Sequence, residues 1–317
     1  EMNKCLYCYE LIENGTEFHE KCSHEFFGSK NPPSIPYAFN QMTDLAKNVV
    51  ERSVAVPGVQ AKLSMSIVKD RVGASTERLT IVGALGGDYI FKPPNNDFDE
   101  MPENENLTMR IAESFGIKVV PSSLVRLVSG ELSYITKRID RAEDGTKIHM
   151  IDMFQITEAF DKYKSSMEKV GKALQSYSDN PMLDKLFLFE LTLFCFLTGN
   201  NDMHLKNFSM ITSASGWILA PAYDLLNVTI VNPTDKEELA LTLESKKSNL
   251  KLEDFIKFGN RLGLNDKQIN GVFKRFIKNK TKAIIWINNS FLSQKMKTKY
   301  FELLEIRYKI VFGQMIK

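Results

Sequence analysis

The sequence predicts an α+β fold in which a small β-rich part precedes a larger helical part. Short segments rich in β-branched residues lie before residue 139, and apolar residues at helical spacing dominate after residue 149. The most apolar run, residues 181–198, contains three charged residues, so it indicates a helix buried in a large core rather than a membrane span. A chain of 317 residues is long enough to bury such a core.

We place the β-rich part at residues 29–138. Its expected strands are residues 63–68, 79–82, 89–92, 119–127 and 132–138. A helix is expected at about residues 103–115, because Pro102 suits a first helical turn and Gly116 suits the position after the last turn. A further helical pattern covers residues 37–52.

The helical part is placed at residues 139–317. Its expected helices are residues 150–160, 166–177, 182–198, 251–263, 266–279 and 282–313. Two short strands, residues 208–211 and 217–219, flank a turn that contains Gly216.

The composition excludes some classes of function. The chain has 41 basic and 39 acidic residues, so the totals show no strong nucleic-acid or membrane footprint. There is no signal-peptide pattern, and we expect a cytoplasmic protein. Three of the four cysteines lie in a Cys/His-rich head that we place at residues 1–28. This distribution favours a local metal site in a reducing compartment over a disulfide framework.

Two pairs of residues in the head have the spacing of zinc ligands. They are Cys5 with Cys8 and His19 with Cys22, and three thiolates with one imidazole satisfy tetrahedral zinc. His24 is an alternative to His19, and a small apolar plug with buried cysteines is an alternative to the metal site. Zinc held by four protein ligands would be structural, because no coordination position stays open.

The strongest chemical signal follows the apolar helix. Asp202 and Asn207 stand five residues apart, which is the catalytic-loop spacing of protein kinases. We predict Asp202 as the general base, and Asn207 and Asp224 as oxygen ligands for Mg²⁺. Lys206 is expected to neutralise charge on a transferred phosphoryl group, and His204 to brace the loop by hydrogen bonding. The alternative is a polar turn that only caps the helix.

Residues of the β-rich part suit the phosphates of ATP. A turn before the first strand can aim backbone N–H groups at phosphates, although an ordinary strand-entry turn has the same pattern. The residues of this turn are Val56, Gly58, Gln60 and Lys62. Lys92 ends an apolar strand and is placed to hold the α- and β-phosphates, unless it is a surface lysine. Glu105 and Glu113 are both candidates for its ion-pair partner.

Residues 137–141 lie where the β-rich part gives way to the helical part. In a two-lobed kinase such a hinge pairs with adenine through its backbone, here at Lys137 and Ile139. An ordinary charged connector is the alternative.

Three separate segments carry a specific resemblance. Residues 199–209, 219–226 and 57–62 resemble the HipA-type toxin kinases of bacterial toxin–antitoxin systems, and the similarity runs over about residues 50–310. The resemblance implies a kinase-like two-lobed fold that uses ATP and Mg²⁺. It also implies phosphorylation of an aminoacyl-tRNA synthetase on serine, restraint by a helix-turn-helix antitoxin, and contact with DNA only through that antitoxin.

The resemblance implies the same roles for the site residues. Asp202 would be the catalytic base, Asn207 and Asp224 the Mg²⁺ ligands, and Lys92 the lysine on the ATP phosphates. These four groups are expected to converge on one magnesium–nucleotide. The leading hypothesis for the function is a protein serine/threonine kinase that acts as a toxin. The competing hypotheses are a pseudokinase that binds an antitoxin and a small-molecule phosphotransferase.

Two features depart from the family pattern. Ala55 stands where many members carry a serine whose phosphorylation switches them off. Either this regulation is absent, or Ser53, Ser64 or Ser66 takes the place of that serine, or residue 55 is itself an altered position. The chain also resembles the short, HipT-like branch, in which a separate small protein supplies a missing N-terminal subdomain, so we expect such a partner.

Overall fold

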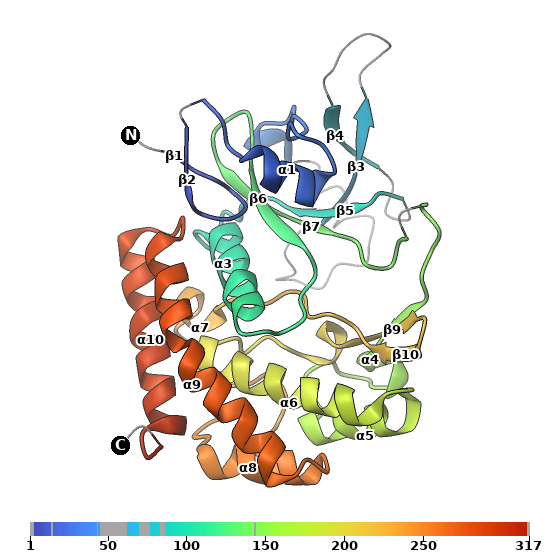
Figure 1. The fold of residues 1–317 in the computed structure, drawn as a ribbon, viewed down its shortest axis with the longest axis vertical. Coiled ribbons are helices and arrows are strands. Elements are labelled where there is room, and N and C mark those ends of the chain that lie inside the picture. Colours follow the sequence, from blue (N-terminus) through green and yellow to red (C-terminus); the bar gives the residue numbers. More distant parts are fainter. Residues whose placement is uncertain are drawn as a thin grey trace. The chain divides into compact units, whose positions relative to one another are not determined.

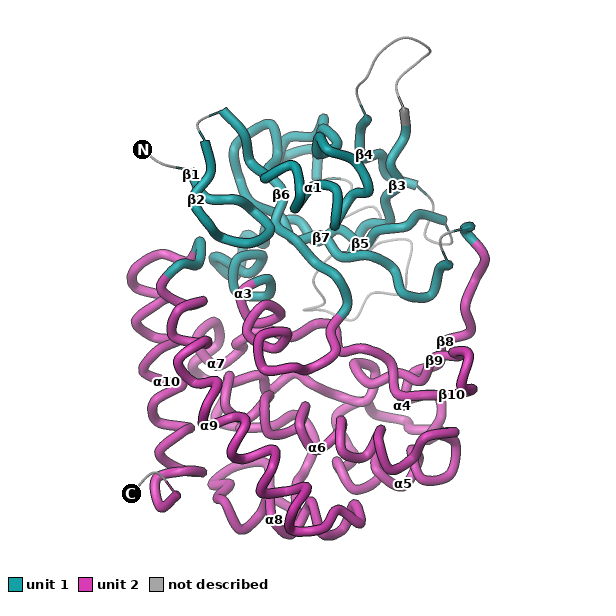
Figure 2. Tube along the Cα trace, viewed as in Figure 1, with its two compact units in different colours: residues 1–106, 120–145, 289–291 teal, residues 107–119, 146–288, 292–317 magenta. Residues whose placement is uncertain are grey.

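The structure is a computed structural model that describes residues 3–13, 15–42, 44, 62–69, 77–82, 86–142 and 144–315. The chain divides into two compact units, coloured separately in Figure 2. Unit 1 comprises residues 1–106, 120–145 and 289–291, and unit 2 comprises residues 107–119, 146–288 and 292–317. The boundaries predicted at residues 28 and 138 stay predictions.

A five-stranded antiparallel sheet forms the centre of unit 1, in the order β4-β3-β5-β7-β6 (Figure 1). The strands are β3 (Leu63–Lys69), β4 (Glu77–Ile81), β5 (Tyr89–Lys92), β6 (Ser122–Arg126) and β7 (Leu132–Lys137). Phe91 of the central strand β5 lies opposite Leu63 on one side and Ile135 on the other, and all three are buried. An apolar row therefore crosses the sheet and fixes its register.

The strand predicted at residues 119–127 is shorter than expected. β6 begins at Ser122, and the preceding Pro121 has no N–H to donate to the ladder. The Pro121 carbonyl oxygen instead accepts hydrogen bonds from the Lys137 backbone and the Thr136 hydroxyl, both at 2.9 Å. This arrangement joins the start of β6 to the end of β7.

The N-terminal head belongs to unit 1 and packs on its sheet. It contains a hairpin of β1 (Asn3–Lys4) and β2 (Leu11–Ile12), followed by helix α1 (Glu20–Phe27). The rings of Phe26 and Phe27 lie 5.9 and 6.2 Å from the ring of Tyr89 in β5. Aromatic contacts thus join α1 directly to the central strand.

Unit 2 is mainly helical (Figure 1). Its elements are the second half of α3 (Met101–Ser114), β8 (Met150–Asp152), α4 (Met153–Ile156), α5 (Met167–Tyr177), α6 (Pro181–Thr198), the 3-10 turn η1 (Leu205–Asn207), β9 (Ser209–Ser213), β10 (Gly216–Leu219), α7 (Val228–Val231), α8 (Leu252–Arg261), α9 (Asp266–Asn289) and α10 (Gln294–Phe312). The helix predicted at residues 103–115 is confirmed as α3, and Gly116 follows it with a φ of +82°.

Helix α6 is the core helix of unit 2, as predicted. Residues 188–198 are all buried, so apolar contacts surround its second half. Its charged residues are paired: Asp184 accepts from the Leu219 backbone at 2.7 Å, and Glu190 lies 2.6 Å from Arg275. Within the described part of the chain, none of the helices combines the length and the hydropathy that a membrane span needs.

Three of the predicted helices of unit 2, at residues 150–160, 266–279 and 282–313, are wrong in their bounds. Residues 150–152 form strand β8, which pairs with β9 in the sheet β10-β9-β8, and Asp152 caps the short α4 by accepting from the Gln155 backbone at 2.9 Å. The break expected at residues 280–281 is absent, because Lys280 and Thr281 do not end a helix. The break lies instead before Ser293, whose hydroxyl caps α10.

The helix predicted at residues 37–52 is described only in part. Residues 39–42 are helical, and residues 45–61 lie outside the described residues. The predictions for Ser53, Ala55, Val56, Gly58 and Gln60 therefore concern residues that the structure does not describe. Lys62 is described and is exposed before β3.

Candidate active site

The loop after α6 starts from a fixed position. Gly199 ends α6 with a φ of +69°, and the Asn200 N–H donates to the Cys195 carbonyl oxygen at 2.9 Å. A Cβ atom at residue 199 would lie 2.4 Å from Leu303 Cδ2 and 2.7 Å from Asn227 Oδ1. Both the left-handed backbone and this close packing require glycine, so the loop leaves the helix at one defined angle.

The side chain of Asn207 returns to the backbone of Asp202. Asn207 Nδ2 donates to the Asp202 carbonyl oxygen at 2.9 Å, and the His204 N–H donates to the same oxygen at 2.8 Å. The spacing of five residues therefore closes a compact polar turn. Because Asn207 Nδ2 is used inside this turn, its Oδ1 is the atom that suits a hard cation such as Mg²⁺.

The carboxylate of Asp202 accepts a hydrogen bond from a tyrosine that sequence reasoning missed. The Tyr163 hydroxyl donates to Asp202 Oδ1 at 2.7 Å. Burial and the neighbouring Asp202 charge both raise the pKa of Tyr163, so it stays a donor at neutral pH. Tyr163 thus fixes the orientation of the predicted base. No local pattern marks this residue, because it stands 39 residues before Asp202.

His204 packs inside the loop. Its ring meets the Tyr163 ring edge-on, with the centroids 5.0 Å apart, and its Nδ1 atom has no hydrogen-bond partner within the described part of the chain. Burial lowers the pKa of His204, although the charges of Asp202 and Asp224 oppose this shift. His204 therefore braces the loop through the hydrogen bond of its backbone N–H to Asp202 and through the ring contact with Tyr163.

Asp224 has a left-handed backbone, with a φ of +55°. The neighbouring Tyr223 joins this segment to the loop: its hydroxyl lies 2.6 Å from Ser209 Oγ and donates to the Lys206 carbonyl oxygen at 3.2 Å. The Lys206 amine of the same loop lies 4.8 Å from the centre of the Phe154 ring. The left-handed backbone of Asp224 is rare for residues other than glycine, and Asp is among those that tolerate it best.

Lys92 is a buried residue and not a surface lysine. It is 3% exposed, and its Nζ atom lies 2.6 Å from Glu105 Oε1. The Tyr134 ring lies 5.3 Å from the same amine. Glu113, the other candidate, pairs with Arg110 at 2.9 Å. The choice left open by the sequence is therefore resolved in favour of Glu105.

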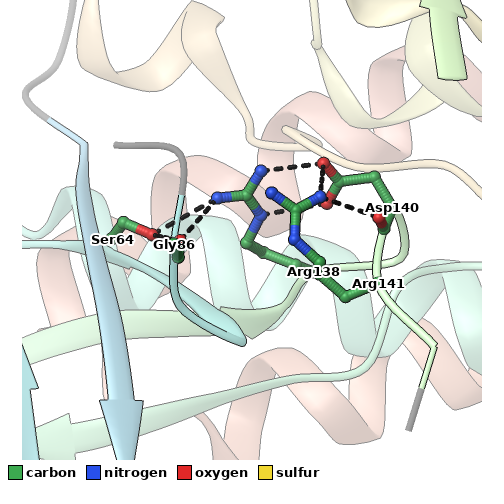
Figure 3. Close-up of polar contacts among 5 residues, drawn as sticks. All are labelled: Ser64, Gly86, Arg138, Asp140 and Arg141. Atoms are coloured by element: carbon green, nitrogen blue, oxygen red, sulfur yellow. Dashed lines mark hydrogen bonds and ion pairs between the residues drawn. The ribbon is translucent and has the colours of Figure 1, made fainter. Parts of the chain in front are cut away.

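Arg138 organises the segment predicted as the hinge. Figure 3 shows its guanidinium group between Asp140 on one side and Gly86 and Ser64 on the other. It donates to the Asp140 carboxylate at 2.9 and 2.7 Å and to the Gly86 carbonyl oxygen at 2.9 Å, and Arg141 adds a contact with Asp140 at 2.6 Å. These contacts hold the pKa of Asp140 below its usual range, so it remains a carboxylate.

The structure distinguishes the two residues whose backbone was predicted to pair with adenine, Lys137 and Ile139. The Lys137 N–H already donates to Pro121, and its side chain lies 3.5 Å from the Glu25 carbonyl oxygen. Ile139 is half-buried and lies in the sequence between Arg138 and Asp140. Ser64 donates to the Gly86 carbonyl oxygen at 2.5 Å, which ties that hydroxyl into the same network.

The proposed site residues are divided between the two units. Lys92 and Glu105 belong to unit 1, whereas Asp202, Asn207 and Asp224 belong to unit 2. Their convergence on one magnesium–nucleotide stays a prediction.

Comparison with known proteins places the chain in a family. Residues 54–284 match the HipA-like C-terminal domain. A candidate kinase of Haemophilus influenzae is 27% identical over an alignment of 293 residues, which covers 83% of this chain and 82% of that protein. The serine/threonine-protein kinase toxin HipA of Shewanella oneidensis is 25% identical over an alignment of 214 residues, which covers 61% of this chain and 47% of that protein.

A solved structure of a similar protein shows which fold the chain has. HipA of Shewanella oneidensis, in its complex with HipB and operator DNA, matches with a TM-score of 0.68 and 21% identity over 84% of this chain and 71% of that one. The predicted kinase-like α+β fold is therefore confirmed. The chain belongs to the family of the HipA-like C-terminal domain.

Proposed function

We propose that this chain is an ATP- and Mg²⁺-dependent protein serine/threonine kinase that acts as a toxin. The observation that carries the proposal is the buried ion pair of Lys92 with Glu105 at 2.6 Å. Burying two charges costs free energy, and a packed apolar pair would be as stable or more stable. Kinases require this lysine–glutamate pair for phosphate binding, which gives a reason to retain it.

The chain's own residues would divide the work as follows. Asp202, oriented by Tyr163, accepts the proton of the attacking hydroxyl group. Lys92 holds the α- and β-phosphates, and Lys206 offsets charge on the transferred group. Asn207 Oδ1 and the Asp224 carboxylate would hold Mg²⁺, which supplies charge neutralisation at the phosphates when bound.

The nucleotide contacts on unit 1 complete the proposal. We assign phosphate contacts to the turn before β3 and adenine contacts to the hinge. Those residues are Val56, Gly58, Gln60, Lys62, Lys137 and Ile139. For the hinge, the occupied N–H of Lys137 favours Ile139 as the backbone donor.

The substrate and partners follow from the family. We propose an aminoacyl-tRNA synthetase as the protein substrate, a helix-turn-helix antitoxin as a partner, and a small protein in place of the N-terminal subdomain. The complex of the Shewanella relative with HipB and operator DNA supports the antitoxin and an indirect link to DNA. Such an activity belongs in the cytoplasm, where these substrates are found.

Radiolabelled ATP added with Mg²⁺ to a cell lysate tests the proposal. Wild-type protein should label one or a few proteins, and Asp202→Asn should abolish the labelling. Asp266→Asn is a matched control, because it removes an exposed carboxylate from the first turn of α9. Labelled protein that is not an aminoacyl-tRNA synthetase would overturn the substrate assignment alone.

The same experiment separates the competing functions. A pseudokinase would bind ATP without transferring phosphate in the wild type. A small-molecule phosphotransferase would label a metabolite pool and leave proteins unlabelled. Either result would refute the protein-kinase proposal.

A further inference from the structure

We propose that Cys5, Cys8, His19 and Cys22 bind one structural Zn²⁺ ion in the head of unit 1. The three sulfur atoms and a ring nitrogen of His19 all lie within 4.8 Å of one another. The site is independent of the proposed phosphate chemistry. Soft thiolates with one imidazole select zinc over hard cations such as Mg²⁺ or Ca²⁺.

The distances inside the cluster fit a single tetrahedral ion. Zinc lies about 2.3 Å from a thiolate and about 2.0 Å from an imidazole nitrogen, so a sulfur and a nitrogen on one ion are about 3.5 Å apart. His19 Nδ1 lies 3.4 Å from Cys8 Sγ and 3.8 Å from Cys22 Sγ. The ligand atoms therefore already stand near the corners of a zinc tetrahedron.

A hydrogen bond fixes which nitrogen of His19 faces the sulfur atoms. His19 Nε2 lies 3.1 Å from the Leu11 carbonyl oxygen. A carbonyl oxygen can only accept, so Nε2 carries the proton and Nδ1 presents a lone pair to the cluster. Metal-binding histidines use their second nitrogen in this way. His24, the alternative ligand in the sequence, is exposed on α1 and outside the cluster.

The backbone holds the two ligand pairs in place. Cys5 and Cys8 occupy the turn between β1 and β2, where the Cys5 N–H donates to Glu10 at 2.9 Å and the Tyr9 N–H donates to Cys5 at 3.0 Å. Tyr9 closes this turn with a φ of +65°. His19 is the N-cap residue of α1, and Cys22 lies in its first turn. The turn that carries Cys5 and Cys8 thus lies next to the first turn of α1, which carries His19 and Cys22. This arrangement is a pre-organised metal site.

Neither an apolar plug with buried cysteines nor a disulfide explains this arrangement of the four side chains. In an apolar plug the sulfur atoms would pack against carbon, whereas here they point at one another and at an imidazole nitrogen. All four cysteines of the chain are free, and one disulfide would use two of the three thiols and leave the histidine without a role. Four protein ligands leave no open position, so the ion is structural and not catalytic.

Metal analysis of the full chain, purified without chelators, tests the site. Wild-type protein should contain about one equivalent of zinc, and Cys8→Ser and His19→Gln should lose most of it. His24→Gln is the matched control for the histidine, and Cys195→Ala is the control for a cysteine outside the cluster. Both controls should keep about one equivalent. Zinc retained in Cys8→Ser and His19→Gln would overturn the proposal.

A second measurement on the wild type covers variants that fail to fold. Zinc is removed with a chelator and replaced with Co²⁺, and the visible spectrum is recorded. Tetrahedral Co²⁺ bound to three thiolates should give strong absorption that added Zn²⁺ abolishes. Wild-type protein that remains folded through residue 28 and binds neither ion would refute the site.

Discussion

The ion pair of Lys92 with Glu105 gives a prediction that can be worked out from the structure. The side chains of the two residues are 4% and 1% exposed, so solvent does not screen their charges. We consider three variants: Lys92→Met, Glu105→Leu, and the double replacement. Each single change leaves one buried charge without the group that it faces at 2.6 Å, whereas the double change removes both charges and fills the space with apolar atoms.

The expected magnitudes follow from Coulomb energy and desolvation. At 2.6 Å the attraction is about 6 kcal/mol for an effective dielectric constant of about 20, and the cost of burying both ions offsets much of it. Removal of one partner from a buried pair costs about 3–5 kcal/mol. The double variant should lose no more than about 1 kcal/mol, because replacement of the whole pair by packed apolar residues is close to neutral or stabilising. The coupling energy between the two sites should therefore be at least about 5 kcal/mol, because two losses of about 3 kcal/mol or more are replaced by one of no more than about 1 kcal/mol.

Hydrogen exchange of the backbone amides in β5 and β7 measures these differences within unit 1. This readout follows residues of unit 1 itself, whereas both tryptophans, Trp217 and Trp286, belong to unit 2. The double variant should also be inactive as a kinase although it is stable. Single variants that lose less than about 1 kcal/mol each would refute the reasoning, since the pair would then behave like a surface salt bridge.

Three other predictions address the loop, the metal and pH. Asp202→Asn should lower phosphoryl transfer about 10²- to 10⁴-fold, whereas Tyr163→Phe should lower it much less, because it removes only the orienting hydrogen bond; steady-state kinetics compare them. Asp224→Asn should keep the fold, since Asn tolerates the left-handed backbone, but should raise the Mg²⁺ concentration needed for activity; an unchanged Mg²⁺ titration would count against the ligand role. Burial raises the pKa of Glu103 from 4.5 to about 7, so between these values the folded state holds a proton that the unfolded state has lost. Stability should fall as pH rises through this window, by up to about 1.4 kcal/mol per unit, and Glu103→Gln should abolish the fall in urea unfolding at pH 5 and 8.

The sequence was informative where a contact depends on local spacing. Asp202 and Asn207, whose spacing predicted one catalytic loop, are joined by a hydrogen bond in the structure, and the catalytic role of the loop stays a prediction. The paired spacings of the head predicted a cluster that the structure brings together. The apolar run of α6 also specified its burial, because a helix with apolar residues on all sides has no other stable place.

Contacts between segments that are far apart in the sequence could not be predicted from local spacing. Glu105 and Glu113 lie eight residues apart on one helix, about 12 Å along its axis, so only the packing of α3 decides which one meets Lys92. The hydrogen bond from Tyr163 to Asp202 depends on the same kind of packing. β8 was mistaken for a helix because three residues are too few to show a strand period. Its partner residues in β9 also lie 57 to 61 residues later in the chain, from Asp152↔Ser209 to Met150↔Ile211.

Tyr9, which closes the turn of Cys5 and Cys8, also contacts helix α3, which carries Glu105. The Tyr9 hydroxyl donates to Asn106 Oδ1 at 2.7 Å, and Asn106 directly follows Glu105. Tyr9 directly follows Cys8 and owes its left-handed backbone to the same turn. If zinc binds as we propose, loss of this metal would free the turn that carries Tyr9, and the position of Glu105 beside Lys92 would then be less tightly held.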